Sequence, residues 1–240
     1  MRIKELPLVR SRAEMASWPV GKFLIDTVNA HSFVVAQQDG DFAAALLKAD
    51  ALLPDGLPIV KACRWLGTEN APDEKIAGAD LFAYEMGKLE EKGGTCFFLG
   101  SSPATLDLIV KRAAETYPHI RVITYSPPYK PVFSPEESRA MVDAVNAADP
   151  DLLWVGMTAP KQEKWLDEHW SELDIHCHAG AIGAVFDFFA GTVKRAPKWW
   201  IDHGLEWFYR FIKEPRRTWR RYMINNPRFL WLVLKEKLSG

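Results

Sequence analysis

The stretch "TCFFLGSSPATLDLIVKRAAETYP" (95–118) decides the fold class of this chain. Its first part, "TCFFLG", is short, apolar and aromatic, which predicts a buried β-strand over 95–100. Residues 102–118 carry apolar side chains at helical spacing, with a proline at the second position, where a helix begins well. A strand that passes through a glycine and two serines into a helix is the repeating unit of an α/β protein.

The same unit recurs on both sides of this stretch. We predict further strands at 22–29, 50–54, 120–126, 151–157 and 174–180. We predict helices at 33–49, with a break near Gly40, and at 58–67, 78–93, 134–150 and 160–170. Ser134 and Glu137 have the spacing of a capping box at the start of one of them. Strands that alternate with helices of this length favour a mostly parallel sheet with helices on both faces.

The composition excludes several classes of protein. With 240 residues, 48% of them hydrophobic and 25% charged, the chain has the make-up of an ordinary globular protein. No stretch approaches the roughly 18 apolar residues of a membrane span, so we expect a cytoplasmic protein whose membrane contact is peripheral. Cys63, Cys96 and Cys177 are scattered in apolar segments, which predicts buried free thiols in a reducing compartment and no disulfide framework.

The alternation of strands and helices stops near Gly191. Residues 192–240 contain five of the ten tryptophans and twelve Lys or Arg against four Asp or Glu. We therefore predict an α/β domain over 1–191 and a helical, basic and aromatic appendage over 192–240. Arginine and aromatic side chains together suit phosphate groups and an anionic membrane surface. RNA binding requires a similar composition, and a helix packed on the body with a solvated basic face is a third interpretation.

Polar residues and glycines collect after the predicted strands, where an open parallel sheet binds its ligands. Two corners, "LGSSPAT" and "HAGAIGAVF", place backbone N–H groups at helix N-termini as a phosphate site requires, although each also fits an ordinary capped turn. Neither has the glycine spacing of a dinucleotide fingerprint, which disfavours a dehydrogenase. The candidate residues from these corners are Thr27, Asn29, Asp55, Gly100, Ser101, Ser102, Lys161, Gln162 and Gly183.

Asp55 lies between Pro54 and Gly56 in "LLPDGLPIV" (52–60), a sequence typical of a tight turn. A Pro-Asp-Gly turn can cap the following helix, or it can hold a carboxylate rigidly as an acid or base at the mouth of a site. The residues themselves leave both interpretations open. The histidines of "HCHAG" form a poor zinc set, and Asp149 and Asp151 lie at the opposite end of the predicted sheet. We therefore expect chemistry without an obligatory metal ion and without a cofactor.

Seven segments, in one order from about residue 24 to 230, resemble the WecG/TagA/CpsF family of glycosyltransferases. They are "TVNAHSFVVA", "ADALLPDGLPIV", "GADLF", "FFLGSS", "GMTAPKQEKW", "GAVFDFFAGTVKRAP" and "GLEWFYRFIKEPRRTWRRY". The resemblance implies a Rossmann-like fold. It also implies an inverting, metal-independent transfer of a hexose derivative from a UDP-sugar to a polyprenyl-diphosphate-linked saccharide, in polysaccharide synthesis at the inner face of the plasma membrane.

The same resemblance assigns roles to particular residues. It implies that Asp55 is the general base, with Thr27 and Asn29 beside it in the site. It further implies that the appendage closes over the site and holds the lipid diphosphate. The arginines concerned are Arg216, Arg217, Arg220 and Arg221.

The remaining candidates suit the donor nucleotide. A diphosphate that leaves without a metal ion needs helix N-termini or cationic side chains to stabilise it. Gly100, Ser101, Ser102 and Gly183 are candidates for that role, and Lys161 and Gln162 for contact with the nucleotide. The expected partners are the UDP-sugar, the lipid-linked acceptor and the membrane surface, with no nucleic acid; a homo-oligomer stays open. The alternative is a non-enzymatic nucleotide- or RNA-binding module that uses the basic tail.

Overall fold

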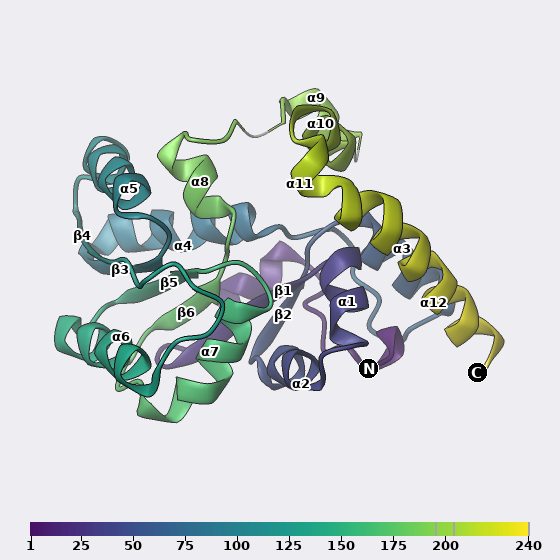
Figure 1. Ribbon diagram of the computed structural model, residues 1–240, viewed down its shortest axis with the longest axis horizontal. Coiled ribbons are helices and arrows are strands. Elements are labelled where there is room, and N and C mark those ends of the chain that lie inside the picture. Colours follow the sequence, from purple (N-terminus) through teal and green to yellow (C-terminus); the bar gives the residue numbers. More distant parts are fainter. Residues whose placement is uncertain (195, 204, 240) are drawn as a thin grey trace.

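The structure is a computed structural model that describes residues 1–194, 196–203 and 205–239. At its centre, six parallel strands form one sheet in the order β2-β1-β6-β5-β3-β4 (Figure 1). The strands are β1 (Phe23–Val28), β2 (Ala51–Pro54), β3 (Gly94–Gly100), β4 (Ile120–Tyr125), β5 (Leu152–Gly156) and β6 (His178–Ala181). The predicted parallel α/β architecture is confirmed.

Helices cover both faces of this sheet (Figure 1). On one face lie α4 (Gly78–Lys92), α5 (Pro103–Thr116) and α8 (Val185–Ala190); on the other lie α2 (Gly40–Lys48), α6 (Pro135–Ala148) and α7 (Lys161–His169). α5 packs against α8, and α2 packs against α7. α1 (Ala30–Ala36) follows β1, α3 (Leu57–Leu66) follows β2, and short 3-10 turns occupy Ile3–Glu5 (η1), Arg12–Ser17 (η2) and Trp170–Glu172 (η3).

Apolar side chains on both faces of the central strands form the core. Phe98 of β3 packs with α4, α5 and α8, whereas its neighbour Phe97 packs with α6 and α7. This follows from the alternation of side chains along a strand that is buried on both faces. The ring of Trp154 is fully buried against Gly180, where any Cβ would overlap it. Gly180, which we assigned to a phosphate-like corner, therefore serves packing inside β6.

The three cysteines match their prediction. Cys63, Cys96 and Cys177 are free and buried. Burial raises the pKa of the Cys63 thiol to about 11 and that of Cys177 to about 12. Thiols with such pKa values carry little thiolate near neutral pH, so they act as small apolar core residues.

Two predicted element boundaries were wrong. The last strand begins at His178 and not at residue 174, because its neighbours start level with it: His178 pairs with Phe23 of β1 and with Leu152 of β5. The backbone N–H of Asp174 instead donates to the Asn146 side chain. The helix predicted from residue 33 begins at Ala30, directly after its cap Asn29. The break predicted near Gly40 is confirmed, since the Asp39 carboxylate accepts the Phe42 N–H at 3.0 Å and starts α2 at Gly40.

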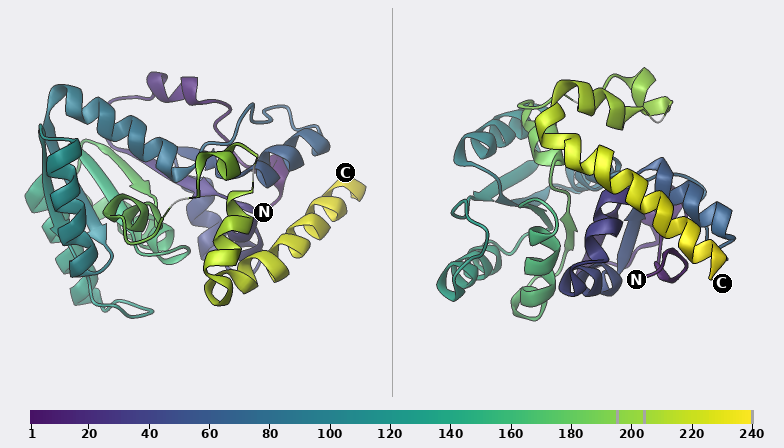
Figure 2. Two further views of the ribbon diagram at one scale, coloured as in Figure 1. Left: turned by 90° about the horizontal axis from the view of Figure 1, so that it is seen from above. Right: turned by 45° about the vertical axis from the view of Figure 1, so that its right-hand side comes forward.

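The predicted helical appendage is confirmed. Its elements are α9 (Lys198–Asp202), α10 (Glu206–Lys213), α11 (Pro215–Trp219), the π-helical turn η4 (Arg220–Asn225) and α12 (Asn226–Leu238). α12 runs back along α1 and α3 (Figure 2), where Phe229 and Val233 are buried in the cluster that those helices form. None of the helices in the described residues is long and apolar enough to cross a membrane. The domain boundary at residue 191 stays a prediction.

Candidate active site

Asp55 lies where the carboxyl ends of two neighbouring strands meet. β1 and β2 are in register from Ile25 opposite Ala51 to Val28 opposite Pro54. The Asp55 N–H donates to the Val28 carbonyl at 2.9 Å, so this residue continues the pairing by one position. Gly56, with φ at +118°, then turns the chain into α3. The corner predicted from the sequence is therefore tied to the sheet by its own backbone.

Asn29 orients the first helix and reaches Asp55. Its side-chain oxygen accepts the N–H groups of His31 and Ser32 at 3.0 and 3.1 Å, and the Ser32 hydroxyl accepts the Asn29 N–H in return. This reciprocal pair is a capping box that begins α1. With the oxygen so occupied, the amide nitrogen faces Asp55 and donates to its carboxylate at 3.4 Å. A structural cap thereby fixes the orientation of the donor to Asp55.

Charged residues of the appendage influence the pKa of Asp55. Burial raises the pKa of this carboxyl above its ordinary value. The positive charges of Arg221 and Arg210 and the Asn29 hydrogen bond act to lower it, whereas the negative charge of Glu206 acts to raise it. All three charged residues belong to α10 or η4, so the C-terminal segment lies over the corner that holds Asp55.

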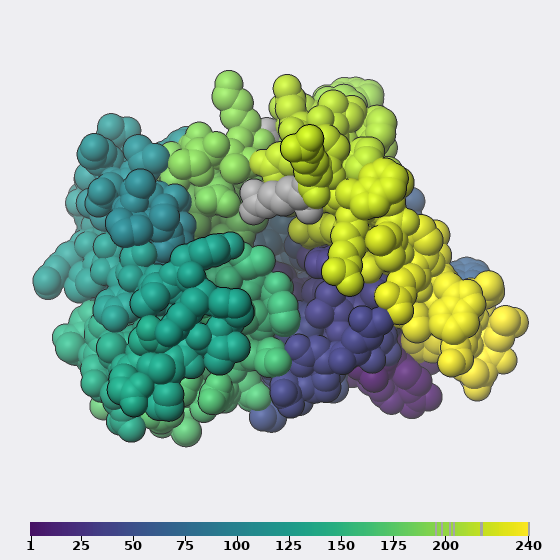
Figure 3. Space-filling model, in the orientation of Figure 1, coloured from purple at the N-terminus to yellow at the C-terminus, as the bar shows by residue number. Residues whose placement is uncertain are grey.

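A hydrogen bond between His31 and Asn225 fastens this segment to α1. Burial lowers the pKa of His31 to about 4, and the nearby positive charges of Arg221 and Arg220 lower it as well. The ring is therefore neutral near pH 7, and its Nδ1 accepts a hydrogen bond from the Asn225 amide. In the space-filling view the C-terminal segment stands directly against α1 (Figure 3).

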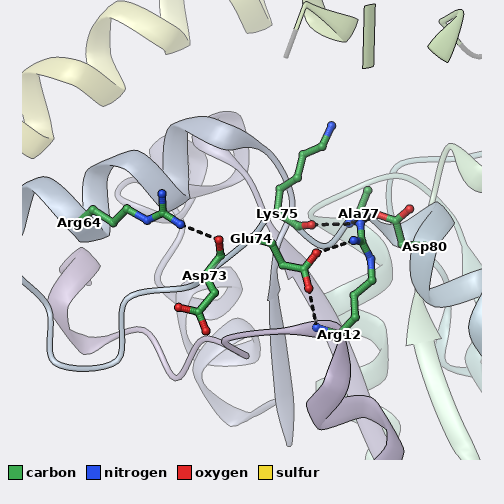
Figure 4. A network of polar contacts seen from close by, with 7 residues as sticks. All are labelled: Arg12, Arg64, Asp73, Glu74, Lys75, Ala77 and Asp80. Carbon is green, nitrogen blue, oxygen red and sulfur yellow. Dashed lines mark hydrogen bonds and ion pairs between the residues drawn. The ribbon is translucent and has the colours of Figure 1, made fainter. Parts of the chain in front are cut away.

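Lys75 makes a second contact between the body and the appendage. The loop between α3 and α4 is held by Arg12, which donates to Glu74 and Asp80, and by Arg64, which donates to the carbonyl of Asp73 (Figure 4). Lys75 points away from that network, and its Nζ donates to the Ile201 carbonyl in α9 at 3.3 Å.

Thr27 is placed beside Asp55 through strand pairing. It lies opposite Leu53 in the register of β1 and β2, two positions before Asp55. Its side chain is partly buried and shares the sheet face of Ile25 and Leu53. Among the predicted residues, Thr27, Asn29 and Asp55 therefore come together at one end of the sheet.

The corner after β3 is a tightly bonded turn. Gly100 has φ at +120°, and a side chain there would collide with the Gly156 carbonyl of the neighbouring β5. Ser101, also at positive φ, donates its N–H to that carbonyl at 3.0 Å. The Ser102 hydroxyl accepts the Thr105 N–H at 3.2 Å and caps α5. Ser102 is therefore engaged as a cap, as the ordinary-turn interpretation expected, while the N-terminus of α5 lies at the ligand-binding edge of the sheet.

Lys161 and Gln162 differ in what they face. The ammonium of Lys161 lies 3.5 Å from the centre of the Phe133 ring and donates to the Lys130 carbonyl, so it braces the loop before α6. Gln162 is buried, and its oxygen accepts the Met157 N–H at 3.2 Å. A Cβ at Gly183 would lie 3.3 Å from that oxygen. Gln162 and Gly183 thus lie side by side beyond β5 and β6.

Two buried carboxyl groups, those of Glu163 and Asp26, belong to the same part of the protein as Gln162. Glu163 is 2% exposed and accepts the Gln162 amide at 3.0 Å, and Asp26 of β1 is completely buried. Among the residues that the structure describes, neither oxygen of Asp26, nor the second oxygen of Glu163, has a hydrogen-bond partner. Burial raises the pKa of Glu163 to about 7, and burial together with the charge of Glu163 raises that of Asp26 well above its ordinary value. Protonated acids are the stable form of such a pair.

The predicted arginines are distributed unevenly around the site. Arg221 is partly buried, and its positive charge lowers the pKa of both Asp55 and His31. Arg220 is exposed, and its charge lowers the pKa of His31. Arg216 is exposed on α11. The side chain of Arg217 lies outside the described residues.

The histidine considered as a metal ligand has a structural role. His178 is buried, with one ring nitrogen 3.1 Å from Glu85 and the other 2.8 Å from the Pro19 carbonyl. The described residues contain no group of three or more His, Cys, Asp or Glu side chains placed to hold a metal ion.

Sequence reasoning missed Glu206 and Asn225 as residues at the site, and it gave no specific role to Arg210 of the basic tail or to His31 after the first strand. Arg210 and Glu206 lie in "GLEWFYRFIKEPRRTWRRY", and His31 lies in "TVNAHSFVVA", so all three were inside segments already singled out. Asn225 lies outside them and had no sequence signal.

The fold and this site define an α/β enzyme with a carboxylate at the end of β2 and arginines brought over it by a C-terminal helical segment. The family model "Glycosyl transferase WecG/TagA/CpsF family" matches residues 3–240, and the chain belongs to this family of glycosyltransferases. It is 33% identical over 214 residues to the Bacillus subtilis (strain 168) N-acetylglucosaminyldiphosphoundecaprenol N-acetyl-beta-D-mannosaminyltransferase, across 89% of this chain and 80% of that protein. A protein of the same name from Bacillus spizizenii is 32% identical over 220 residues, 92% of this chain and 81% of its own.

Proposed function

We propose that this glycosyltransferase moves N-acetylmannosamine from a UDP-sugar to N-acetylglucosamine carried on a polyprenyl diphosphate. The observation that supports it most directly is the Asp55 carboxylate, bonded to Asn29 and lying beneath Arg210 and Arg221. The names of the two Bacillus relatives supply the donor sugar and the acceptor class. The product is a lipid-linked disaccharide for synthesis of a cell-surface or secreted polysaccharide.

Asp55 serves as the general base. It removes the proton from the acceptor hydroxyl while that oxygen bonds to the anomeric carbon; the bond from this carbon to the UDP oxygen breaks, and UDP leaves with the electron pair. A single displacement of this kind inverts the anomeric configuration. A base whose pKa lies above that of an ordinary Asp accepts a proton more readily, and the Asn29 amide keeps the carboxylate oriented.

Cationic side chains and helix N-termini stabilise the charge of the departing diphosphate. The residues available are Arg210 and Arg221 of the appendage and the backbone N–H groups at the start of α5. Gly183 and Gln162 form the wall beyond β5 and β6 on which the nucleotide rests. We therefore expect the reaction to require no metal ion.

The appendage attaches the protein to the membrane that carries its acceptor. Most exposed large apolar side chains of the described residues lie in this segment: Trp199, Trp207, Phe208, Ile212, Trp219, Met223, Ile224, Leu230, Trp231, Leu234 and Leu238. Exposed cations accompany them, among them Arg216, Arg220 and Arg228. Aromatic and cationic side chains on one helical segment suit the interface of an anionic bilayer.

The decisive experiment offers three donors to one acceptor. The full chain is incubated with UDP-N-acetylmannosamine, UDP-N-acetylglucosamine or UDP-N-acetylgalactosamine and with N-acetylglucosaminyl diphosphate bearing a farnesyl chain, and products are followed by mass spectrometry. We expect one N-acetylhexosamine to be added from the first donor, with EDTA having no effect. Transfer from one of the other two donors would show that the proposed donor sugar is wrong. Absence of transfer, combined with steeply salt-dependent RNA binding, would favour the nucleic-acid alternative.

A further inference from the structure

An apolar groove with a volume of about 600 Å³ lies between α3 and α12. Ala62 and Trp65 of α3 form one side of it, and Phe229 and Leu234 of α12 form another. The segment that leads into α10 contributes a third side, including Trp207. Its volume lies within the range of roughly 300–1,000 Å³ that small-molecule sites occupy.

The lining of this groove suits a hydrocarbon and not a sugar or nucleotide. Among the side chains that the structure describes, Lys61 and His203 are the polar ones that line the groove, and the others are aliphatic or aromatic. None of these described lining residues carries a carboxylate, amide or hydroxyl group. Sugars and nucleotides require several convergent hydrogen-bonding groups, whereas a hydrocarbon chain requires only apolar surface that is shielded from water.

One side of the groove adjoins the catalytic corner. Leu57 and Pro58 line it, and they follow Asp55 and Gly56 directly in the chain. Trp207, on another side, is adjacent in sequence to Glu206, whose charge acts on Asp55. A molecule whose diphosphate meets the arginines above Asp55 can therefore place an attached apolar chain in the groove.

The outer side of the groove continues into an exposed apolar surface on α12. Leu230 and Leu234, which line the groove, are 66% and 46% exposed. Trp231 and Leu238 of the same helix extend this surface at 59% and 79% exposure. A hydrocarbon chain in the groove thus has an apolar path from the catalytic corner to the outer face of α12.

We propose that this groove binds the isoprene units of the acceptor that lie next to its diphosphate; the proposal rests on the proposed function and adds a binding site for the lipid. The arginines above Asp55 are positively charged and complement the diphosphate, while the groove complements the chain attached to it. The occupant is the polyprenyl chain itself. The enzyme therefore binds three parts of its acceptor: the sugar, the diphosphate and the first part of the lipid chain.

The test compares acceptors that differ only in their chain. N-acetylglucosaminyl diphosphate is prepared with a methyl, a hexyl or a farnesyl group, and transfer is measured without vesicles. For the wild-type protein we expect KM to fall at least about tenfold from methyl to farnesyl, because apolar carbons leave water on binding. Leu230→Glu should raise KM for the farnesyl acceptor about tenfold. Leu47→Glu, the same change at an exposed position on α2 outside the groove, should leave that KM unchanged.

A binding measurement separates this proposal from the proposed function. Calorimetry with farnesyl diphosphate and with inorganic diphosphate requires no turnover, and thermal unfolding verifies that both variants are folded. Tighter binding of farnesyl diphosphate, lost in Leu230→Glu and kept in Leu47→Glu, supports the groove even if the donor sugar is wrong. Equal binding of the two diphosphates, or equal losses in the two variants, would overturn it and leave the bilayer as the only lipid contact.

Discussion

The amide nitrogen of Asn29 lies 3.4 Å from the carboxylate of Asp55, across the ends of β1 and β2. The same side chain caps α1 through its oxygen. One residue therefore couples the start of a helix to the orientation of the proposed base. The pairing of β1 with β2 holds both residues in place, since Asp55 donates its N–H to Val28, the residue before Asn29.

Asp55→Asn should fold normally and lose transfer. The amide keeps the size of the carboxylate but cannot take a proton from the acceptor, so we expect kcat to fall by about 10²–10⁴. Asp73→Asn is the matched control, because Asp73 is an exposed carboxylate in the loop before α4. Initial rates with the farnesyl acceptor and thermal unfolding measure both properties. Near-normal turnover in Asp55→Asn would exclude Asp55 as the base.

Asn29→Ser should separate the two roles of Asn29. Serine also caps helices, so the free energy of unfolding should change by less than about 0.5 kcal/mol, whereas Asn29→Ala should lose about 1 kcal/mol. Serine does not carry the amide that faces Asp55, and we expect kcat to fall about tenfold or more. Denaturant unfolding and steady-state rates measure the two effects. Full activity in the folded serine variant would show that Asn29 is a cap alone.

Arg221→Gln should move the acid limb of the pH–rate profile to higher pH. Transfer requires ionised Asp55, so kcat/KM falls as pH falls through the pKa of this carboxyl. The positive charge of Arg221 holds that pKa down against burial, and its removal lets the pKa rise. Arg228→Gln removes the same charge from α12, and we expect its acid limb to match that of the wild-type protein. Identical limbs in all three proteins would show that Arg221 does not act on the base.

Glu163→Gln should change the pH dependence of stability. The pKa of Glu163 is raised from 4.5 to about 7 in the folded state, so the native protein holds a proton that the unfolded chain releases. That contribution is complete below about pH 4.5 and is lost as pH rises through about 7. The glutamine variant should therefore gain on the order of 1–3 kcal/mol at pH 8 relative to wild type.

Urea unfolding at several pH values measures this gain. Glu168→Gln is the control on the same helix, because the Glu168 side chain is 75% exposed. A gain for Glu163→Gln that is the same at pH 5 and pH 8 would contradict a buried, protonated carboxyl.

The double variant Trp231→Ser, Leu238→Ser should weaken membrane binding. Both side chains are more than half exposed on α12, and their loss removes apolar surface that enters the interface. We expect the partition coefficient of the double variant onto anionic vesicles to be at least about tenfold below that of the wild-type protein. Salt should weaken the binding of both proteins. Tyr129→Ser with Val132→Ser removes exposed apolar groups from the loop before α6 and serves as control. Equal partitioning of the two double variants would argue against a membrane face on α12.

The strand-and-helix alternation of residues 22–190 was enough to predict the parallel sheet. Apolar runs such as 95–100 specify strands buried on both faces, and glycines such as Gly67 and Gly93 end the helices where predicted. The corner at Asp55 was also predictable, because Pro54 restricts the backbone locally and Gly56 allows the positive φ that the turn requires. These features depend on neighbours in sequence, so composition and spacing carry the information.

The electrostatics at Asp55 depended on tertiary structure. Arg210 and Arg221 are more than 150 positions from Asp55 in the sequence, and only the packing of α12 on α1 and α3 brings their charges to it. The burial of Asp26 and Glu163, which lie 137 positions apart in the sequence, likewise results from tertiary packing and raises the pKa of both groups. Local pattern thus determined the fold and the position of the proposed base, whereas long-range packing decided which charges and apolar walls surround it, because desolvation and Coulomb interactions depend on distance in space.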